Sequence, residues 1–365
     1  MEDTFMDLAG RHLPDIFLAR DGSKIENAAQ WEENRPALLD LIAKYEYGIL
    51  PDAAVRCSYE EVYANKNTFH AGHSTLQGIE VTAQNSVGQH KWTFYLALPK
   101  ASKKVPVLLH IEFDPHYPVH TVPVENICSR GYGYATFQYT DVTSDNNDFT
   151  DGVARLFYPN GQRGEHDGGK IALWAWAMSR VLDCLERDPR INSHEVIAVG
   201  HSRLGKTALW ASACDTRFFG AVPNGSGCAG AALFRGNTGE QNYDISLHFP
   251  YWFAPAFAGF DADVTTLPFD QHQTIALTAP RHMFVMSGSK DNWADPASEY
   301  LGCVAASDVW TLYGKKGIEV LTEEEIGENR ILSGGDIGYQ RREGTHFLGC
   351  TDYTRLMDFF DTKRS

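Results

Sequence analysis

Short, almost continuous apolar runs after Pro99 place the tightest constraint on how this chain can fold. They are Val105–Ile111, Gly133–Phe137, Glu195–Val199 and Met283–Met286. Runs of this length and composition are typical of strands that are buried on both faces of a parallel sheet. Helical stretches lie between them, most clearly at Gly169–Glu186 and Gly205–Cys214. Alternating strands and helices predict an α/β fold, a three-layer αβα sandwich around a mostly parallel central sheet.

The residues before Pro99 predict a different kind of strand. Three segments have strand-like composition, and the last alternates apolar and polar residues: Tyr59–Tyr63, Gly78–Thr82 and Lys91–Leu98. We therefore expect the sheet to begin with an antiparallel N-terminal edge. Residues 1–50 form a lead-in segment with one helix, about Trp31 to Tyr45, which Gly48 and Pro51 end. No linker-like stretch divides the chain, so residues 1–365 are expected to form a single domain. The acidic run Glu323–Glu325 and the segment Leu332–Tyr339 are expected on the solvated surface.

Charge and hydropathy exclude several classes of partner. There are 32 Lys and Arg residues against 47 Asp and Glu, a formal net charge of −15. A field of this sign repels phosphate backbones and anionic lipids, so we expect neither nucleic acid nor a membrane surface as a partner. No apolar window reaches the roughly 18 residues that a spanning helix needs.

The N-terminal residues and the cysteines indicate in which cellular compartment the protein is expected. The N-terminus is acidic where a secretory leader is basic, which favours a cytoplasmic location for this chain; secretion stays open if a leader precedes residue 1. Seven scattered cysteines without a CxxC pair favour reduced, mostly buried thiols.

The segment from Val196 to Leu209 reads as a strand, a sharp turn and a helix, with Ser202 at the turn. A nucleophilic serine needs a strained turn with small neighbours, and here Gly200 precedes it and Gly205 follows it. The helix that starts behind the serine would direct its N–H groups at the oxygen that becomes negative during acyl transfer. The pattern is G-x-S-x-x-G, and the alternative is a serine that merely caps a helix.

A nucleophilic serine also needs a base and an orienting carboxylate, in the order Ser, Asp or Glu, His for an α/β-hydrolase fold. His346 lies in a short glycine-containing loop, Glu343–Phe347, before a predicted C-terminal helix at Asp352–Phe360. We therefore expect His346 to be the base. The other histidines after the serine are His248, His272 and His282, and of these His248 and His282 are expected to be structural.

The carboxylate is expected in the polar loop that follows the apolar run Met283–Met286. This loop contains Asp291 and Asp295, and Asp291 is favoured because an aspartate before Pro296 also suits a turn or a helix start. The alternative is that both aspartates cap the next helix.

These segments together resemble the glucuronoyl esterases, carbohydrate esterase family fifteen, and in particular their bacterial branch. The resemblance extends from about Pro14 to Phe360. It rests on Gly200–Lys206, Ser226–Leu233, Gly239–Glu240, Asp291–Pro296 and Gly344–His346.

The resemblance implies an α/β-hydrolase that cleaves esters of glucuronic acid on glucuronoxylan or its oligosaccharides, with Ser202 as nucleophile and His346 as base. It implies that Arg203 helps to hold the oxyanion, as a cation beside a nucleophile can. It implies sugar contacts from Lys206, Glu240 and Trp293; a carboxylate accepts from hydroxyls and an indole covers a pyranose ring. Lys206 is expected on the exposed end of the helix that starts behind Ser202.

The sequence departs from the family pattern at two places. Many members carry the triad glutamate where this chain has Gly225, which cannot orient a histidine, so the resemblance also points to Asp291 as the acid. The segment His110–Tyr117 lacks an expected asparagine and glycine, so that part of the oxyanion hole or pocket rim is expected to differ.

The segment after the Val105–Ile111 run does not have the pattern of a metal site. Alternation would place His110, Glu112 and Asp114 on one strand face, but no HExxH-like spacing is present and serine hydrolysis needs no metal. We expect neither a metal nor another cofactor.

Two other functions stay open: an acetyl esterase acting on xylan with the same triad, and an inactive carbohydrate-binding homologue. The alcohol, the glycan length and the oligomeric state are not determined by the sequence.

Overall fold

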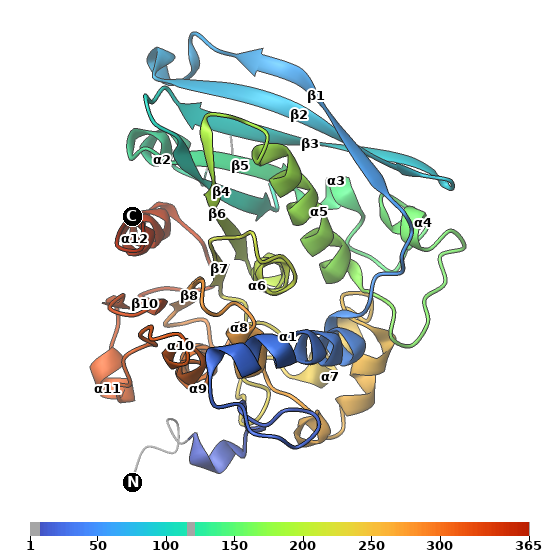
Figure 1. The fold of residues 1–365 in the computed structure, drawn as a ribbon, viewed down its shortest axis with the longest axis vertical. Coiled ribbons are helices and arrows are strands. Elements are labelled where there is room, and N and C mark those ends of the chain that lie inside the picture. The colour runs from blue at the N-terminus through green and yellow to red at the C-terminus, as the bar shows by residue number, and fades with distance from the viewer. Residues whose placement is uncertain (1–7, 115–120, 365) are drawn as a thin grey trace.

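The computed structural model describes residues 8–114 and 121–364, and within them ten strands form one sheet (Figure 1). The order across the sheet is β1-β2-β3-β5-β4-β6-β7-β8-β10-β9. The strands are β1 Arg56–Asn65, β2 Ser74–Asn85, β3 Gly88–Pro99, β4 Val105–Glu112, β5 Gly133–Gln138, β6 Ile191–His201, β7 Gly220–Asn224, β8 His282–Gly288, β9 Arg330–Leu332 and β10 Ile337–Arg342.

The middle of the sheet is parallel and its N-terminal edge is antiparallel, as the sequence predicts, and β9 adds an antiparallel pair with β10 at the other end. β1, β2, β3 and β5 pair antiparallel in turn, whereas β5, β4, β6, β7, β8 and β10 form a parallel series. After β5 the chain crosses to the other side of β4 to form β6. Loops that follow β4 and β6 therefore diverge, which opens a crevice outside the carboxyl ends of the strands. Ser202 directly follows β6.

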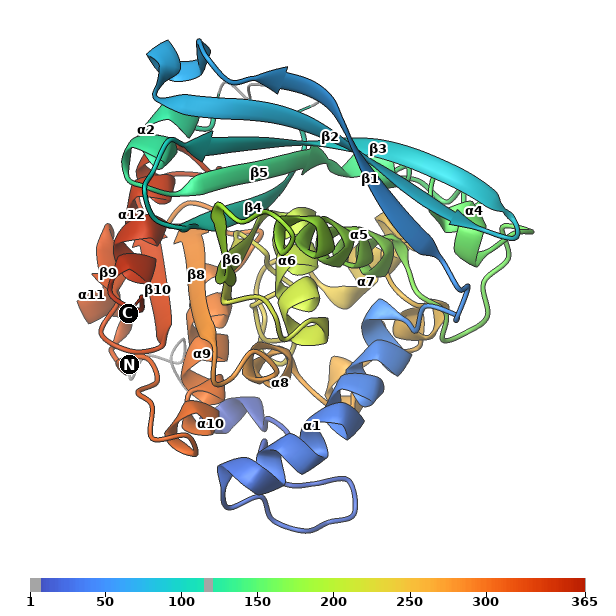
Figure 2. The same cartoon turned by 45° about the horizontal axis from the view of Figure 1, so that its top comes forward.

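Helices cover both faces of the sheet, because side chains alternate along the buried strands (Figure 2). Among the described residues the α-helices are α1 Ala28–Ile42, α2 Val124–Ser129, α3 Tyr139–Val142, α4 Ala154–Phe157, α5 Lys170–Leu185, α6 Arg203–Cys214, α7 Asn242–His248, α8 Gln271–Ala276, α9 Pro296–Ala306, α10 Asp308–Thr311, α11 Glu323–Ile326 and α12 Cys350–Asp361. On β6, Val196 and Ala198 join the core under α5 and α6, whereas Ile197 and Val199 join the core under α2 and α12. This is the predicted three-layer sandwich.

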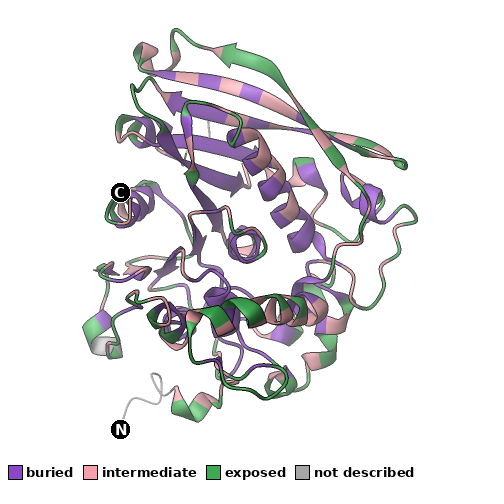
Figure 3. Cartoon of the chain, viewed as in Figure 1, coloured by how far each residue is buried: buried purple, intermediate pink, exposed green. Residues whose placement is uncertain are grey.

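Burial decreases from the middle of the sheet to its N-terminal edge (Figure 3). The central strands β4 and β7 are buried over almost their whole length, while β1 is mostly exposed. The helix predicted at Trp31–Tyr45 is present as α1, with a short π-helical extension over Ala43–Tyr47.

The C-terminal side of the sheet corrects one expectation. Leu332–Tyr339 was expected on the solvated surface, and this is wrong: Ile337 and Tyr339 are buried in β10, which pairs with β8. The apolar segment of β10 is short and follows polar and glycine-rich residues, so the local composition resembles that of a surface loop. The neighbouring strand β8 covers this segment in the fold. Glu325 is exposed as expected, and the side chains of Glu323 and Glu324 lie outside the described residues.

The cysteines correct another expectation, that the thiols are mostly buried. All seven are free, but three are buried, two are half-buried, and Cys214 and Cys350 are exposed. These two lie at the end of α6 and the start of α12, where a helix end leaves the core. Among the described residues, no helix combines the length and the apolar character needed to cross a bilayer.

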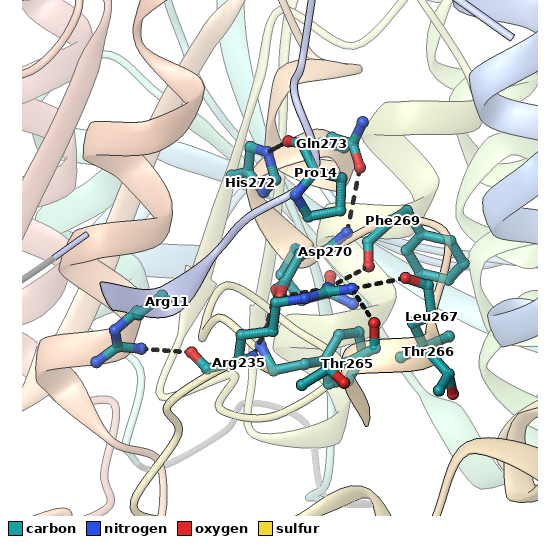
Figure 4. A network of polar contacts seen from close by, with 12 residues as sticks. Arg11, Pro14, Arg235, Thr265, Thr266, Leu267, Phe269, Asp270, His272 and Gln273 are labelled. Carbon is teal, nitrogen blue, oxygen red and sulfur yellow. Dashed lines mark hydrogen bonds and ion pairs between the residues drawn. The ribbon is translucent and has the colours of Figure 1, made fainter. Parts of the chain in front are cut away.

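The N-terminal segment is tied to the body of the protein through a buried ion pair (Figure 4). Arg235 pairs with Asp270 at 3.0 Å and donates to three backbone carbonyls of the segment 265–269. Arg11 donates to the Arg235 carbonyl at 3.0 Å and to Ser298 Oγ at 2.8 Å. His272 contacts the carbonyl of Pro14 at 3.0 Å, which is a structural contact.

Candidate active site

Ser202 occupies a strained turn between β6 and α6. Its φ of +59° and ψ of −130° lie outside the regions that non-glycine residues favour, and such strain is typical of functional turns. Its backbone N–H donates to the Asn224 carbonyl on β7 at 2.9 Å, which holds the turn against the sheet. Its side chain makes no capping bond to α6. The alternative of a simple helix cap is therefore wrong.

The two neighbouring glycines are required by close backbone contacts. A Cβ at Gly200 would lie 1.9 Å from the Leu204 carbonyl oxygen. A Cβ at Gly205 would lie 3.1 Å from the carbonyl oxygen of Asn224. Small residues at these positions let α6 start directly behind Ser202, as the sequence predicts.

His346 and Asp291 come together from two loops that follow neighbouring strands. The loop after β10 carries His346 and the loop after β8 carries Asp291; His346 Nδ1 lies 2.5 Å from Asp291 Oδ2. Asp291 is buried, whereas the His346 side chain is 41% exposed. A carboxylate at Nδ1 holds the proton there and leaves Nε2 free to act as a base.

Asp295 has a different task, which separates it from Asp291. Its Oδ1 accepts from the Ser298 N–H at 3.0 Å and so caps α9. Its Oδ2 accepts from the Thr238 N–H at 2.7 Å and from Ser298 Oγ at 2.7 Å. The alternative that both aspartates cap a helix therefore holds for Asp295 only.

His201 lies beside His346 but stays neutral. Its ring centroid is 4.3 Å from that of His346, and its Nδ1 accepts from Asn224 Nδ2 at 2.7 Å. Burial, helped by the neighbouring His346, lowers the pKa of His201 to about 3. His201 therefore adds no positive charge that would hinder protonation of His346.

Gly225 packs directly against the His346–Asp291 pair. A Cβ there would lie 3.2 Å from His346 Nδ1 and 3.3 Å from Asp291 Oδ2, at a backbone φ of +49°. A larger side chain would occupy the space of the contact between base and acid. The glycine and the aspartate of the later loop thus fit each other sterically.

Lys206, Glu240 and Trp293 form one chain of contacts. Lys206 Nζ donates to Glu240 Oε2 at 3.1 Å, and Trp293 Nε1 donates to Glu240 Oε1 at 3.3 Å. Lys206 also donates to the carbonyls of Ser226 and Cys228. Trp293 is 57% exposed, so this series of contacts begins at the buried Lys206 and ends at an exposed indole.

The expected exposed position of Lys206 is wrong. Its side chain is only 4% exposed, because the loops 226–240 cover this flank of α6. The three ammonium protons are used by three acceptors, so Lys206 holds Glu240 and two backbone carbonyls from beneath.

Arg203 leaves the same helix start on another side. Its Nη1 contacts Asp145 Oδ2, and its guanidinium carbon lies 4.5 Å from the Trp252 ring centroid and 5.2 Å from that of Phe249. Sequence reasoning missed Asp145 and both rings. Each comes from a segment more than 40 residues away, and nothing in its local pattern sets it apart.

The remaining expectations concern the histidine-rich segment after β4. His110 is buried, and its Nδ1 contacts the hydroxyls of Tyr134 and Tyr353, each at 2.9 Å. Burial lowers the pKa of His110. Within residues 8–114 and 121–364, no three His, Cys, Asp or Glu side chains group as metal ligands would. The rim residues Pro115, His116 and Tyr117 lie outside the described residues.

His282 is structural, as expected. Its Nδ1 lies 3.0 Å from Asp336 Oδ1, and burial lowers its pKa to about 4. His248 is the last residue of α7, and its ring packs beside that of Phe249.

A serine in a strained strand–helix turn, with a histidine and an aspartate on later loops of a mostly parallel sheet, defines the α/β-hydrolase class. Comparisons with known proteins identify the family. The model of the family described as "Glucuronyl esterase, fungi" matches residues 79–314. The curated relative carbohydrate esterase MZ0003, from an unknown prokaryotic organism, is 30% identical over 96% of this chain and 89% of its own.

Solved structures agree with these sequence matches. A glucuronoyl esterase from Solibacter usitatus superposes with a TM-score of 0.88 at 30% identity, covering 97% of this chain and 98% of that one. A promiscuous esterase of carbohydrate esterase family 15, from a marine bacterial metagenome, has a TM-score of 0.87 at 30% identity, with 96% of each chain covered. The chain therefore belongs to the glucuronoyl esterase family, carbohydrate esterase family 15.

Proposed function

We propose that this protein is a serine carboxylester hydrolase that cleaves esters of glucuronic acid or 4-O-methyl-glucuronic acid. One observation carries the proposal. Ser202 follows β6 and Lys206 lies in the helix behind it, while the loops after β7 and β8 hold Glu240, Trp293 and Asp291. Lys206 contacts Glu240 and Glu240 contacts the exposed Trp293, and Asp291 contacts His346 on the loop after β10. A nucleophile and a sugar-binding surface thus share one edge of the sheet.

The reaction follows from the positions of these groups. Ser202 Oγ attacks the ester carbonyl and passes its proton to His346 Nε2, while the α6 N-terminus and Arg203 stabilise the oxyanion. As the tetrahedral intermediate collapses, His346 protonates the leaving alcohol and a glucuronoyl ester of Ser202 remains. Water, deprotonated by His346, then attacks this ester; the uronic acid leaves and Ser202 regains its proton.

Trp293 and Glu240 are the residues proposed to bind the sugar ring of the ester. An exposed indole covers a pyranose ring well, and its orientation is set here by the Nε1 contact with Glu240. Glu240 keeps acceptor capacity for sugar hydroxyls beyond these contacts. Relatives named 4-O-methyl-glucuronoyl methylesterase support the uronate; that from Phanerochaete carnosa is 27% identical over 83% of this chain. We take glucuronoxylan or its oligosaccharides as the source of the ester.

An acetyl esterase activity is the second candidate. It has in its favour the structural relative described as a promiscuous esterase, and the same triad would serve. The two activities differ in which side of the ester carries the sugar. Loss of Glu240 or Trp293 would impair hydrolysis of a uronate ester but leave that of a small acetyl ester largely intact.

The test is hydrolysis of benzyl and methyl glucuronate beside 4-nitrophenyl acetate, by the wild type and by Ser202→Ala. We expect turnover of the glucuronate esters that Ser202→Ala abolishes. Turnover of the acetate alone would transfer the assignment to the acetyl esterase. Binding of glucuronate without hydrolysis of any of the three esters would favour the carbohydrate-binding homologue.

A further inference from the structure

Asp145 lies half-buried beside Arg203 and contacts residues of distant segments. Its side chain is 12% exposed. Oδ2 contacts Arg203 Nη1 and accepts from the Tyr139 hydroxyl at 3.0 Å, and Oδ1 accepts from Trp252 Nε1 at 2.8 Å. Its backbone carbonyl accepts from the Tyr251 hydroxyl at 2.9 Å. The carboxylate is thus fixed from several directions, and it is the ionic partner of Arg203.

The guanidinium of Arg203 is held by its faces as well as by one edge. Its central carbon lies 4.5, 5.2 and 5.8 Å from the ring centroids of Trp252, Phe249 and Phe113. Phe249 and Trp252 stack on each other at 3.8 Å, which keeps this aromatic wall rigid. In the described part of the chain, Nε of Arg203 is buried without a hydrogen-bond partner, and Nη1 contacts Asp145. One donor next to Ser202 is therefore unused.

Within the described residues, the carboxylate of Asp145 accepts from side chains and does not bond the backbone of its own loop. Asp151 bonds this backbone: its Oδ2 accepts from the Ser144 N–H at 2.8 Å and its Oδ1 from Thr143 Oγ1 at 2.8 Å. The buried Lys170 lies 3.2 Å from Asp151 and also donates to Thr143. Asp145, in contrast, directs its carboxylate at Arg203 and at the aromatic residues around it.

A carboxylate paired with Arg203 suits the chemistry of the reaction. An oxyanion exists only in the transition state and the tetrahedral intermediates, but the product of a uronate ester is a carboxylate that stays anionic at neutral pH. An uncompensated arginine would hold that product as well as the oxyanion. A fixed carboxylate lowers the net charge while it leaves the geometry of the free N–H donors intact.

We propose that Asp145 is a positioning residue for this reaction: it fixes the guanidinium of Arg203 beside Ser202 and offsets its charge, so that Arg203 stabilises the oxyanion without retaining the uronate product. The part of the inference that concerns product release rests on the proposed function. The part that concerns the oxyanion requires only that the protein hydrolyses an ester.

The test is a double-mutant cycle with Asp145→Asn, Arg203→Ala and their combination, with Asp151→Asn as the matched control on the same loop. The measurements are kcat and KM for benzyl glucuronate and the inhibition constant of free glucuronate. We expect Asp145→Asn to lower kcat about tenfold or more, to leave KM nearly unchanged and to lower the inhibition constant several-fold. In the Arg203→Ala background it changes neither value further. Asp151→Asn lowers the melting temperature but leaves the inhibition constant at its wild-type value.

The proposal is overturned if Asp145→Asn lowers kcat equally with and without Arg203, or if it leaves the inhibition constant unchanged. The same cycle is run on 4-nitrophenyl acetate, because every ester hydrolysis forms an oxyanion. If the wild type hydrolyses the acetate but no glucuronate ester, the proposed function fails. The coupling of Asp145 with Arg203 in acetate hydrolysis then decides the positioning role separately.

Discussion

Arg203 and Lys206 lie three residues apart at the start of α6, yet the two cations meet opposite surroundings. Lys206 is 4% exposed, and three acceptors use its three protons. Arg203 is 25% exposed, contacts one carboxylate through Nη1 and is otherwise covered by aromatic rings. A cation with every donor used can only hold its neighbours in place, whereas one with free donors can bind what arrives. Charge near a nucleophile is therefore no guide to its task until its partners are known.

The comparison assumes that both cations serve one nucleophile, and Ser202→Ala tests that first. We expect hydrolysis to fall roughly 10⁴-fold to 10⁶-fold, since the covalent step is lost. The measurement is turnover of benzyl glucuronate and 4-nitrophenyl acetate. Ser289→Ala is the control, since Ser289 is on the loop that follows β8 and bonds the exposed Glu328; its activity should stay within about twofold of wild type. Comparable losses in both variants would contradict the role of Ser202.

Lys206→Met tests the buried side of the comparison. Removing one partner of a buried ion pair leaves Glu240 uncompensated, so we expect a loss of about 3–5 kcal/mol in the free energy of unfolding. KM for glucuronate esters should rise, because Glu240 no longer holds Trp293. Chemical denaturation gives the first value and steady-state kinetics the second.

The matched control is Lys290→Met. Lys290 pairs with Glu343 at 3.3 Å, and both side chains are more than half exposed, so this pair should contribute less than about 1 kcal/mol. If both lysine variants lose the same free energy of unfolding, the burial of Lys206 does not strengthen its ion pair.

Arg203→Ala tests the open side. Loss of an oxyanion donor should lower kcat about 10²-fold to 10³-fold with a smaller change in KM. Stability should fall less than in Lys206→Met, since the guanidinium is partly exposed. Arg217→Ala, which removes a surface ion-pair cluster with Asp215 and Glu186, should leave kcat unchanged. A rise in KM at constant kcat would instead assign Arg203 to ground-state binding.

The smallest effect concerns two buried acids near Lys206. Glu299 accepts from Ser226 Oγ and the Gly227 N–H, and Glu46 accepts from Gln271. Burial raises the pKa of Glu299 to about 7 and that of Glu46 to about 8, from an ordinary value of 4.5. Both folded carboxyls therefore keep a proton that the unfolded chain has already released between pH 4.5 and these values.

Each of these two acids should accordingly contribute a decline in the free energy of unfolding as pH rises, from about 4.5 to 7 for Glu299 and from about 4.5 to 8 for Glu46. Glu46→Gln and Glu299→Gln should each flatten this decline, whereas Glu60→Gln on the exposed strand β1 should not. The measurement is the melting temperature between pH 4.5 and 8.5. A slope that survives in the double variant would assign the pH dependence to other groups.

Local patterns were enough to predict much of the fold. Seven of the ten strands and four of the longer helices follow from apolar runs, alternation and glycine or proline ends. Local patterns did not predict β7, β9 and β10. The strand Gly220–Asn224 contains a proline, and Arg330–Leu332 is very short. Their strand conformation depends on a neighbouring strand that already exists, and a local pattern carries no information about that neighbour.

The sequence by itself determined the turn at Ser202 and the loops that carry Asp291 and His346. Steric limits on the turn and the chain order of an α/β-hydrolase act locally or through strand order, so they can be read along the chain. Only the tertiary structure decided the rest: that Asp291 faces His346 while Asp295 caps α9, that Lys206 is buried, and that Asp145 meets Arg203. Burial and ionic pairing depend on which distant segments pack together, and a residue's own neighbours in the chain do not specify them.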